Sequence, residues 1–237
     1  MEIGLLMIHY IILSCKKLEH FRKIQKITWL KYINKDDTFC FLSGKEHKTE
    51  EENVYWTDTT DDYLSCPNKY IDYIRNGLNQ LDKKWYFFCD DDSFVFPNRL
   101  NELLKKYDFN KSHIVMNPNP YEKPDDPKNT RYSNFVETGE TFYPNISPLG
   151  GGGFAISRFA MINMINYLKN TINPAICVNS DRAIAHWLSA SGLKQNDMIF
   201  NYFLYNDAPN DLQIKDSRFI SFHRVSLDKM VSYCNLI

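Results

Sequence analysis

Apolar runs alternate with helix-like patterns along the first ninety or so residues of the chain. Residues 5–13 form a continuous β-prone run, as expected of a parallel strand that is covered on both faces. Residues 17–32 carry apolar side chains at helical spacing and predict a helix. Further strands are predicted at 38–42 and 84–89, with a second helix at 69–81. This alternation predicts an α/β fold with a mostly parallel central sheet flanked by helices.

The next segment contains the clearest helical pattern and the longest irregular one. Pro97 suits the first turn of a helix, and leucines follow it at helical spacing as far as residue 104. Residues 117–148 are rich in Pro, Asn, Asp and Gly, which predicts a long irregular or hairpin region. Loops of that length are usually functional or disordered.

The last third begins with a run of four glycines at 150–153. A short apolar run follows, and Ser157 is a plausible cap for the next helix. Another helix is predicted to begin near Ser180, and residues 219–225 predict a final short strand. The chain shows no repeat or linker that would divide it, so we expect a single domain over residues 1–237.

Composition narrows the range of partners. The 237 residues carry a formal net charge of −1, so nothing draws the chain as a whole towards nucleic acid or anionic lipid. The apolar start at 3–14 is shorter than the roughly 20 residues that a membrane helix requires. We interpret it as a buried strand, and expect a soluble chain without a membrane span or anchor, in the cytoplasm rather than the secretory lumen.

Three consecutive aspartates, Asp90, Asp91 and Asp92, follow the predicted strand at 84–89. Three carboxylates at the end of a buried strand repel one another unless a positive charge lies beside them. Oxygen ligands select Mg²⁺, Mn²⁺ or Ca²⁺ rather than zinc, and open α/β sheets bind ligands at the carboxyl ends of their strands. The alternative is that the three residues only end a strand and begin a turn. That interpretation is the better one for the other acidic pairs, Asp36-Asp37, Asp61-Asp62 and Asp125-Asp126.

Four blocks of residues, taken in chain order, resemble one known family. They are His20-Phe21-Arg22 with Thr28-Trp29; Asp62-Tyr63-Leu64 with Lys69 and the segment from Lys84 to Val95; Gly150 to Phe154 with Ile156-Ser157-Arg158; and Asp181 with Phe222-His223. Each block is weak alone, but together they resemble the Fringe-like inverting β-glycosyltransferases, which include β-1,3-N-acetylglucosaminyl- and galactosyltransferases.

The resemblance implies a GT-A fold, Mn²⁺ (with Mg²⁺ as the alternative) and a uridine-diphosphate sugar donor. It implies that Asp92 and His223, with Asp90 beside them, hold the metal, and that Asp181 is the catalytic base. It also implies a nucleotide-binding half at 1–96 and an acceptor-binding half at 97–237. The positions predicted to bind the donor are Ser14, Arg22, Lys69, Asp90, Asp91, Gly151 and Gly152.

Taken without the resemblance, several of these residues have ordinary explanations. Asp181 after Ser180 is a standard helix start, with a hydroxyl cap and a negative charge near the positive end of the helix dipole. A lone His223 is more often a surface or core histidine than a ligand, and a glycine run can be a plain turn. The chain also departs from the family, with Ser180 in place of an acid and Ala185 in place of a glycine.

Three functions remain open from the sequence. The first is an inverting, metal-dependent glycosyltransferase that moves a sugar to a hydroxyl of a glycan or glycoprotein acceptor. The second is a sugar- or nucleotide-binding module of the same fold with impaired catalysis, which the departures at Ser180 and Ala185 motivate. The third is a metal-dependent phosphohydrolase that uses the same acids. We favour the first.

Overall fold

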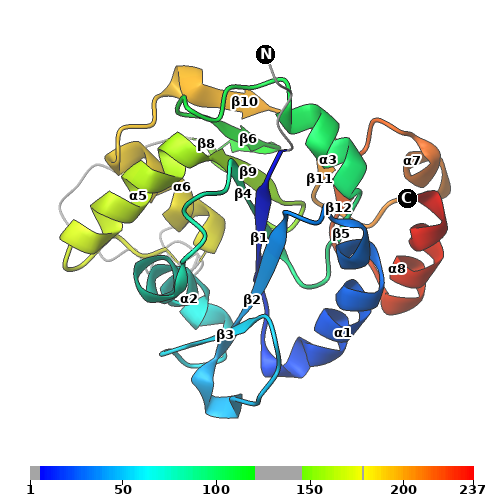
Figure 1. Cartoon of the computed structure of the whole chain (residues 1–237), viewed down its shortest axis with the longest axis horizontal. Coiled ribbons are helices and arrows are strands. Elements are labelled where there is room, and N and C mark those ends of the chain that lie inside the picture. Colours follow the sequence, from blue (N-terminus) through cyan, green and yellow to red (C-terminus); the bar gives the residue numbers. More distant parts are fainter. Residues whose placement is uncertain (1–5, 121–145, 178) are drawn as a thin grey trace, which may run out of the picture.

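The computed structural model describes residues 6–120, 146–177 and 179–237. Seven strands form its central sheet: β1 (Ile8–Leu13), β2 (Thr38–Gly44), β3 (Val54–Thr57), β4 (Trp85–Asp90), β6 (Ile114–Met116), β9 (Phe154–Ser157) and β10 (Met198–Phe200). Their order across the sheet is β10-β6-β9-β4-β1-β2-β3 (Figure 1).

Most neighbours in the sheet are parallel. β4, β1, β2 and β3 run parallel in one block, and β10 runs parallel to β6. β9 lies between β4 and β6 and is antiparallel to both. The prediction of an α/β fold with a mostly parallel sheet is therefore confirmed. The carboxyl ends of β1, β2 and β4 meet at one edge, which is where Asp90 ends β4.

Helices cover both faces of the sheet (Figure 1). One face packs against α1 (Glu19–Ile27), α3 (Pro97–Leu104), α7 (Asp211–Lys215) and α8 (Leu227–Tyr233). The other packs against α2 (Cys66–Asp72), α5 (Arg158–Asn170) and α6 (Ser180–Ala190). Neighbouring residues of β1 show why its apolar run is continuous: Tyr10 and Ile12 belong to the first core, and Ile11 to the second.

A smaller sheet joins the tail of the chain to the segment after the aspartates. It consists of β5 (Phe94–Val95), β11 (Leu204–Tyr205) and β12 (Ser221–Phe222), in which β12 is antiparallel to β5 and parallel to β11. The expected last strand at 219–225 is thus shorter than predicted. Its pairing with β5 is what brings residue 223 to the carboxyl edge of the large sheet.

A two-stranded ladder frames the long polar segment. β7 (Pro118–Pro120) pairs antiparallel with β8 (Ile146–Pro148), in agreement with the predicted hairpin region. The intervening residues 121–145, including Asp125-Asp126, lie outside the described residues.

Two predicted helices differ from those observed. The segment 17–32 is split at Thr28, whose backbone (φ −108°, ψ −116°) leaves the helical region, so α1 ends at Ile27. The helix expected at 69–81 begins earlier, at Cys66 with Pro67 in its first turn, and continues as a π-helix over Tyr73–Gly77. Single turns of 3-10 helix complete the structure at Lys16–Leu18, Trp29–Tyr32, Lys45–His47, Tyr63–Ser65, Gln195–Asp197 and Cys234–Leu236.

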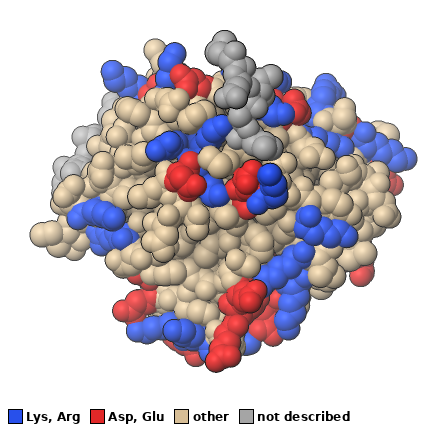
Figure 2. All heavy atoms as spheres, in the orientation of Figure 1, with Lys and Arg blue, Asp and Glu red and all other residues tan. Residues whose placement is uncertain are grey.

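The distribution of surface charge and the length of the helices can be compared with the partners and location expected from the sequence. Basic and acidic side chains are interspersed over the face shown in Figure 2, in line with the near-neutral net charge. Among the described residues, every helix is too short or too polar to cross a membrane. This finding does not bear on the cellular compartment, so it gives the expected cytoplasmic location no support.

Candidate active site

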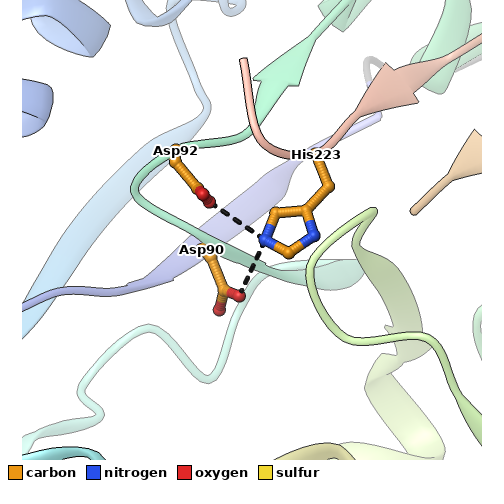
Figure 3. A group of neighbouring side chains, drawn as sticks. All are labelled: Asp90, Asp92 and His223. Atoms are coloured by element: carbon orange, nitrogen blue, oxygen red, sulfur yellow. Dashed lines mark ion pairs between the residues drawn. The ribbon is translucent and has the colours of Figure 1, made fainter. Parts of the chain in front are cut away.

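Three of the predicted site residues meet at the carboxyl edge of the large sheet. Asp90 is the last residue of β4, Asp92 follows in the next turn, and His223 comes directly after β12. Nε2 of His223 lies 3.1 Å from Oδ1 of Asp92 and 3.5 Å from Oδ2 of Asp90, and points between the two carboxylates (Figure 3). One potential ligand atom from each residue lies within 4.8 Å of the others.

The charges and unmet hydrogen bonds of this group fit a divalent cation. Burial disfavours the charged imidazole, but the carboxylates of Asp90 and Asp92 outweigh it and raise the pKa of His223 to about 10. Within the described residues, Oδ1 of Asp92 and Nδ1 of His223 are buried without a well-aligned hydrogen bond. Two carboxylates and an imidazole are a donor set that a divalent metal ion satisfies.

The glycine run allows the histidine to come this close. A Cβ atom on Gly151 would lie 2.2 Å from the ring of His223, a distance that no side chain can occupy. The carbonyl of Gly151 accepts a hydrogen bond from the buried hydroxyl of Ser93, at 2.6 Å. Gly151 therefore makes room for a protein side chain at the candidate metal site, in addition to lining the pocket.

A pocket of about 190 Å³ opens beside the metal group. Asp90, His223, Gly151 and Asp181 are among the residues that line it. The remaining lining residues are Leu13, Tyr63, Cys66, Tyr70, Gly150, Phe154, Asn179, Ser180, Ile184 and Asn206. The structure thus brings two of the predicted metal ligands, Asp90 and His223, together with the predicted base around one cavity.

Asp181 is held at the start of α6 by backbone amides. Its Oδ1 accepts from the amide of Arg182 at 2.8 Å and its Oδ2 from the amide of Gly150 at 3.2 Å. Burial raises its pKa above the usual range in spite of these hydrogen bonds, and the charge of Asp90 adds to the effect. The prediction of a Ser180 cap is wrong: Asn179 is the N-cap, because the helical backbone already includes Ser180.

Asp91, Ser14 and Arg22 are not among the residues that line the pocket, and they form a buried chain. The hydroxyl of Ser14 donates to Oδ2 of Asp91 at 2.7 Å and accepts from Arg22 at 3.1 Å. Arg22 also donates to Glu51 at 2.9 Å and has no exposed surface. Burial, aided by the charges of its two neighbouring aspartates, raises the pKa of Asp91 to about 8, against the hydrogen bond from Ser14. These three residues, which the resemblance predicted to contact the donor, therefore form a buried network next to the metal group.

Lys69 is a fourth predicted donor contact that proves to be buried. Its Nζ donates to Oδ1 of Asp61 at 2.6 Å and to the carbonyl of Ser14 at 3.0 Å. Asp61, which the sequence assigned only to a turn, has its side chain paired with this buried lysine. Asp62 does cap the turn Tyr63–Ser65, and Asp37 binds two backbone amides, as a structural interpretation of these acids predicts.

Gly152 and Ala185 lie away from the pocket. A Cβ on Gly152 would lie 2.8 Å from the carbonyl of Tyr205, and its amide donates to Asn206 at 3.0 Å. Ala185 is buried within α6. The sequence analysis did not identify Glu51 and Asn206, and it assigned Asp61 only to a turn.

The fold is similar to that of solved glycosyltransferases. A solved glycosyltransferase involved in the glycosylation of the major capsid of PBCV-1 matches with a TM-score of 0.50 and 11% identity, over 98% of this chain and all of that one. The galactosyltransferase LgtC, solved with donor and acceptor sugar analogues, matches with a TM-score of 0.47 and 8% identity, over 97% of this chain and 96% of that one.

The sequence assigns the family. A family model described as Fringe-like matches residues 7–226, and the chain belongs to this family. The β-1,3-N-acetylglucosaminyltransferase lunatic fringe of Xenopus laevis is 28% identical over 149 residues, which is 58% of this chain and 36% of that protein. The matched region thus spans about a third of the length of that relative.

Proposed function

We propose that this protein is an inverting, Mn²⁺-dependent glycosyltransferase that uses a uridine-diphosphate sugar and glycosylates a hydroxyl of a glycan or glycoprotein. One observation carries the proposal: Asp90, His223 and Asp181 line the same pocket of about 190 Å³. A sugar ring in such a pocket would have a place for its diphosphate at the metal group and a carboxylate within the same cavity. Inversion requires attack from the side opposite the leaving group.

Asp90, Asp92 and His223 would hold the metal ion. When bound, a divalent cation neutralises the charge that develops on a leaving diphosphate. The mixed donor set of two carboxylates and one imidazole suits Mn²⁺ better than Mg²⁺, which prefers oxygen ligands alone. Mn²⁺ is therefore the ion we propose, with Mg²⁺ as the weaker alternative.

Asp181 would take the proton of the acceptor hydroxyl. A general base works best when its pKa lies near the working pH, and burial moves the pKa of Asp181 in that direction. The amides of Arg182 and Gly150 fix the carboxylate in place. We propose that residue 181 is the base because it is the described carboxylate that lines the pocket apart from the metal group.

The remaining residues predicted to bind the donor have two roles in this proposal, as a pocket lining and as its support. Gly151 lines the pocket and can approach the donor through its backbone. Ser14, Arg22, Lys69 and Asp91 shape the edge on which the donor rests. The division into a nucleotide-binding half at 1–96 and an acceptor-binding half at 97–237 remains part of the proposal.

Calorimetric binding of a panel of nucleotide sugars, with Mn²⁺ or with chelator, tests the proposal on the wild type and on Asp92→Ala. We expect one uridine-diphosphate sugar to bind, and to need both Mn²⁺ and Asp92. Absence of binding by every member of the panel would refute the proposed donor site.

The departures at Ser180 and Ala185 favour a binding module as the second candidate. Such a module would bind the same donor without turnover, so the two candidates differ in transfer to an acceptor and in hydrolysis. A phosphohydrolase would release the nucleotide without any acceptor. Among the described residues a single group of three could hold a metal, which gives little support to a two-metal hydrolase.

A further inference from the structure

We propose that Asp61 is a positioning residue for the donor nucleotide, acting through the turn that follows β1. This turn, residues 14–16, lies beside the candidate metal group. The inference rests on the proposed function, because it concerns how that site is shaped for its donor.

The side-chain carboxylate of Asp61 joins three elements of the fold. Its Oδ2 accepts from the backbone amide of Lys16 at 2.5 Å, and its Oδ1 accepts from the amide of Gly44 at 2.8 Å. Its Oδ1 also accepts from Lys69 of α2 at 2.6 Å. The end of β2 is shaped for this contact, since a Cβ on Gly44 would lie 2.9 Å from the backbone nitrogen of Asp61.

Lys69 holds the other side of the same turn. Its Nζ donates to the carbonyl of Ser14 at 3.0 Å while it is paired with Asp61. The turn is thus held on both sides of Cys15, by the carbonyl before it and the amide after it. Both side chains of the ion pair are almost fully buried, at 1% and 6% exposure, so neither partner can be replaced by water.

The turn passes this constraint on to the site. Ser14 holds Oδ2 of Asp91 at 2.7 Å, and Asp91 separates the two acidic metal residues along the chain. Leu13, directly before the turn, lines the pocket. A shift of the turn would therefore move a pocket wall and the side chain that lies behind the metal group. Small displacements of such supporting groups have large effects on binding.

A purely structural role is the competing explanation, and the chain offers a matched control for it. Asp37 is also a buried carboxylate that accepts two backbone amides, those of Ile8 at 2.8 Å and Asn34 at 3.0 Å. It has a buried lysine nearby too, since Lys83 donates to the carbonyl of Asp36 at 2.6 Å. Asp37, however, ties down the amino end of β1, at the edge opposite the pocket.

The test compares Asp61→Asn, Asp61→Asn with Lys69→Met, and Asp37→Asn. The double variant removes both charges and carries the test if the single variant does not fold. Dissociation constants are measured for Mn²⁺ alone and for uridine diphosphate at saturating Mn²⁺, beside unfolding curves. We expect both Asp61 variants to bind uridine diphosphate about tenfold or more weakly, as for loss of other supporting groups. We expect Asp37→Asn to stay within about twofold of wild type for the same ligand.

Wild-type binding of uridine diphosphate by the Asp61 variants would overturn the inference, and so would an equal loss in Asp37→Asn. Mn²⁺ binding should stay within about twofold in all variants, because the metal ligands keep their own supports. Failure of the wild type itself to bind uridine diphosphate would refute the proposed function together with this inference. Failure of the proposed function is therefore seen in the wild type, whereas failure of this inference alone is seen only in the variants.

Discussion

The imidazole of His223 lies 3.1 Å from the carboxylate of Asp92, although one follows the last strand of the fold and the other follows β4. The pairing of β12 with β5 creates this contact, since it sets Phe222 opposite Phe94. A backbone hydrogen bond of 2.9 Å from the amide of Val225 to the carbonyl of Asp92 closes the arrangement. Backbone pairing thus holds the two candidate ligands close together, whatever contact their side chains make.

Replacement of Asp92 by alanine should abolish tight metal binding without unfolding the protein. The variant removes one of two carboxylates but leaves the strand pairing intact, so we expect Mn²⁺ affinity to fall by about tenfold or more. Titration with Mn²⁺ followed by calorimetry measures the loss. Asp82→Ala, at an exposed acid just before the same strand, is the control and should bind Mn²⁺ like the wild type.

Replacement of Gly151 by alanine should weaken metal binding although Gly151 is no ligand. The new Cβ would lie 2.2 Å from the His223 ring, so the ring or the glycine run must move. We expect a loss of Mn²⁺ affinity of about tenfold. Equal Mn²⁺ affinity in the variant and the wild type would show that the ring can move without cost.

Gly192→Ala separates this effect from a general loss of stability. Gly192 has a φ of +104°, and no atom of the described residues lies within 4 Å of the point that a Cβ would occupy. Alanine there is therefore strained in its backbone but meets no neighbouring side chain. We expect a destabilisation on the order of 1–2 kcal/mol, measured by denaturant unfolding, with unchanged Mn²⁺ affinity.

Replacement of Asp181 by asparagine should remove turnover and keep donor binding. Loss of a general base typically costs about 10²–10⁴ in rate, and the isosteric amide can still accept from the amide of Gly150. Initial rates of transfer and the dissociation constant of the donor are the two measurements. Asp211→Asn is the control, since Asp211 opens α7 in a similar helical position outside the pocket. Full turnover in Asp181→Asn would reassign residue 181 to a helix-start role.

The sequence was most informative where one element carries its own signal. The apolar run before Asp90 predicted β4, and three acids after it predicted a cation site at a strand end. β6, β9 and β10 were not predicted, because strands of three or four residues show too little periodicity to be told from loops. The antiparallel direction of β9 depends on tertiary packing, which local sequence does not record.

The burial and pairing of charged side chains were also not predicted from the sequence, and Arg22 and Asp61 show why. The resemblance to the Fringe-like family predicted that Arg22 contacts the donor, but its lack of exposed surface follows from Glu51 and Ser14, which belong to other segments. Asp61 sits in a polar stretch that is typical of a turn, and its importance comes from partners in three distant elements. Pairings of this kind become visible only once the chain is folded.

His9 should make the folded protein sensitive to acid, independently of the active site. It is buried in β1, with Nδ1 at 2.7 Å from the hydroxyl of Thr38 and Nε2 at 2.6 Å from that of Tyr73. Burial, with the positive charge of Lys83, lowers its pKa to about 3, against the effect of a hydrogen bond to the Thr38 backbone. The folded protein therefore keeps His9 neutral at pH values where the unfolded chain, with a histidine pKa of about 6.5, binds a proton.

Stability must then fall as the pH decreases from about 6.5 towards 3, because the unfolded state binds the extra proton throughout that window. The slope from this one group approaches about 1.4 kcal/mol per pH unit, so the total is on the order of several kcal/mol. His9→Gln retains hydrogen-bonding groups without the titration, so its unfolding free energy should fall less steeply with acid than that of the wild type. His20→Gln, at an exposed histidine, should follow the wild-type curve. Denaturant unfolding at a series of pH values, with chelator present, measures all three, and parallel curves for His9→Gln and wild type would contradict the assignment.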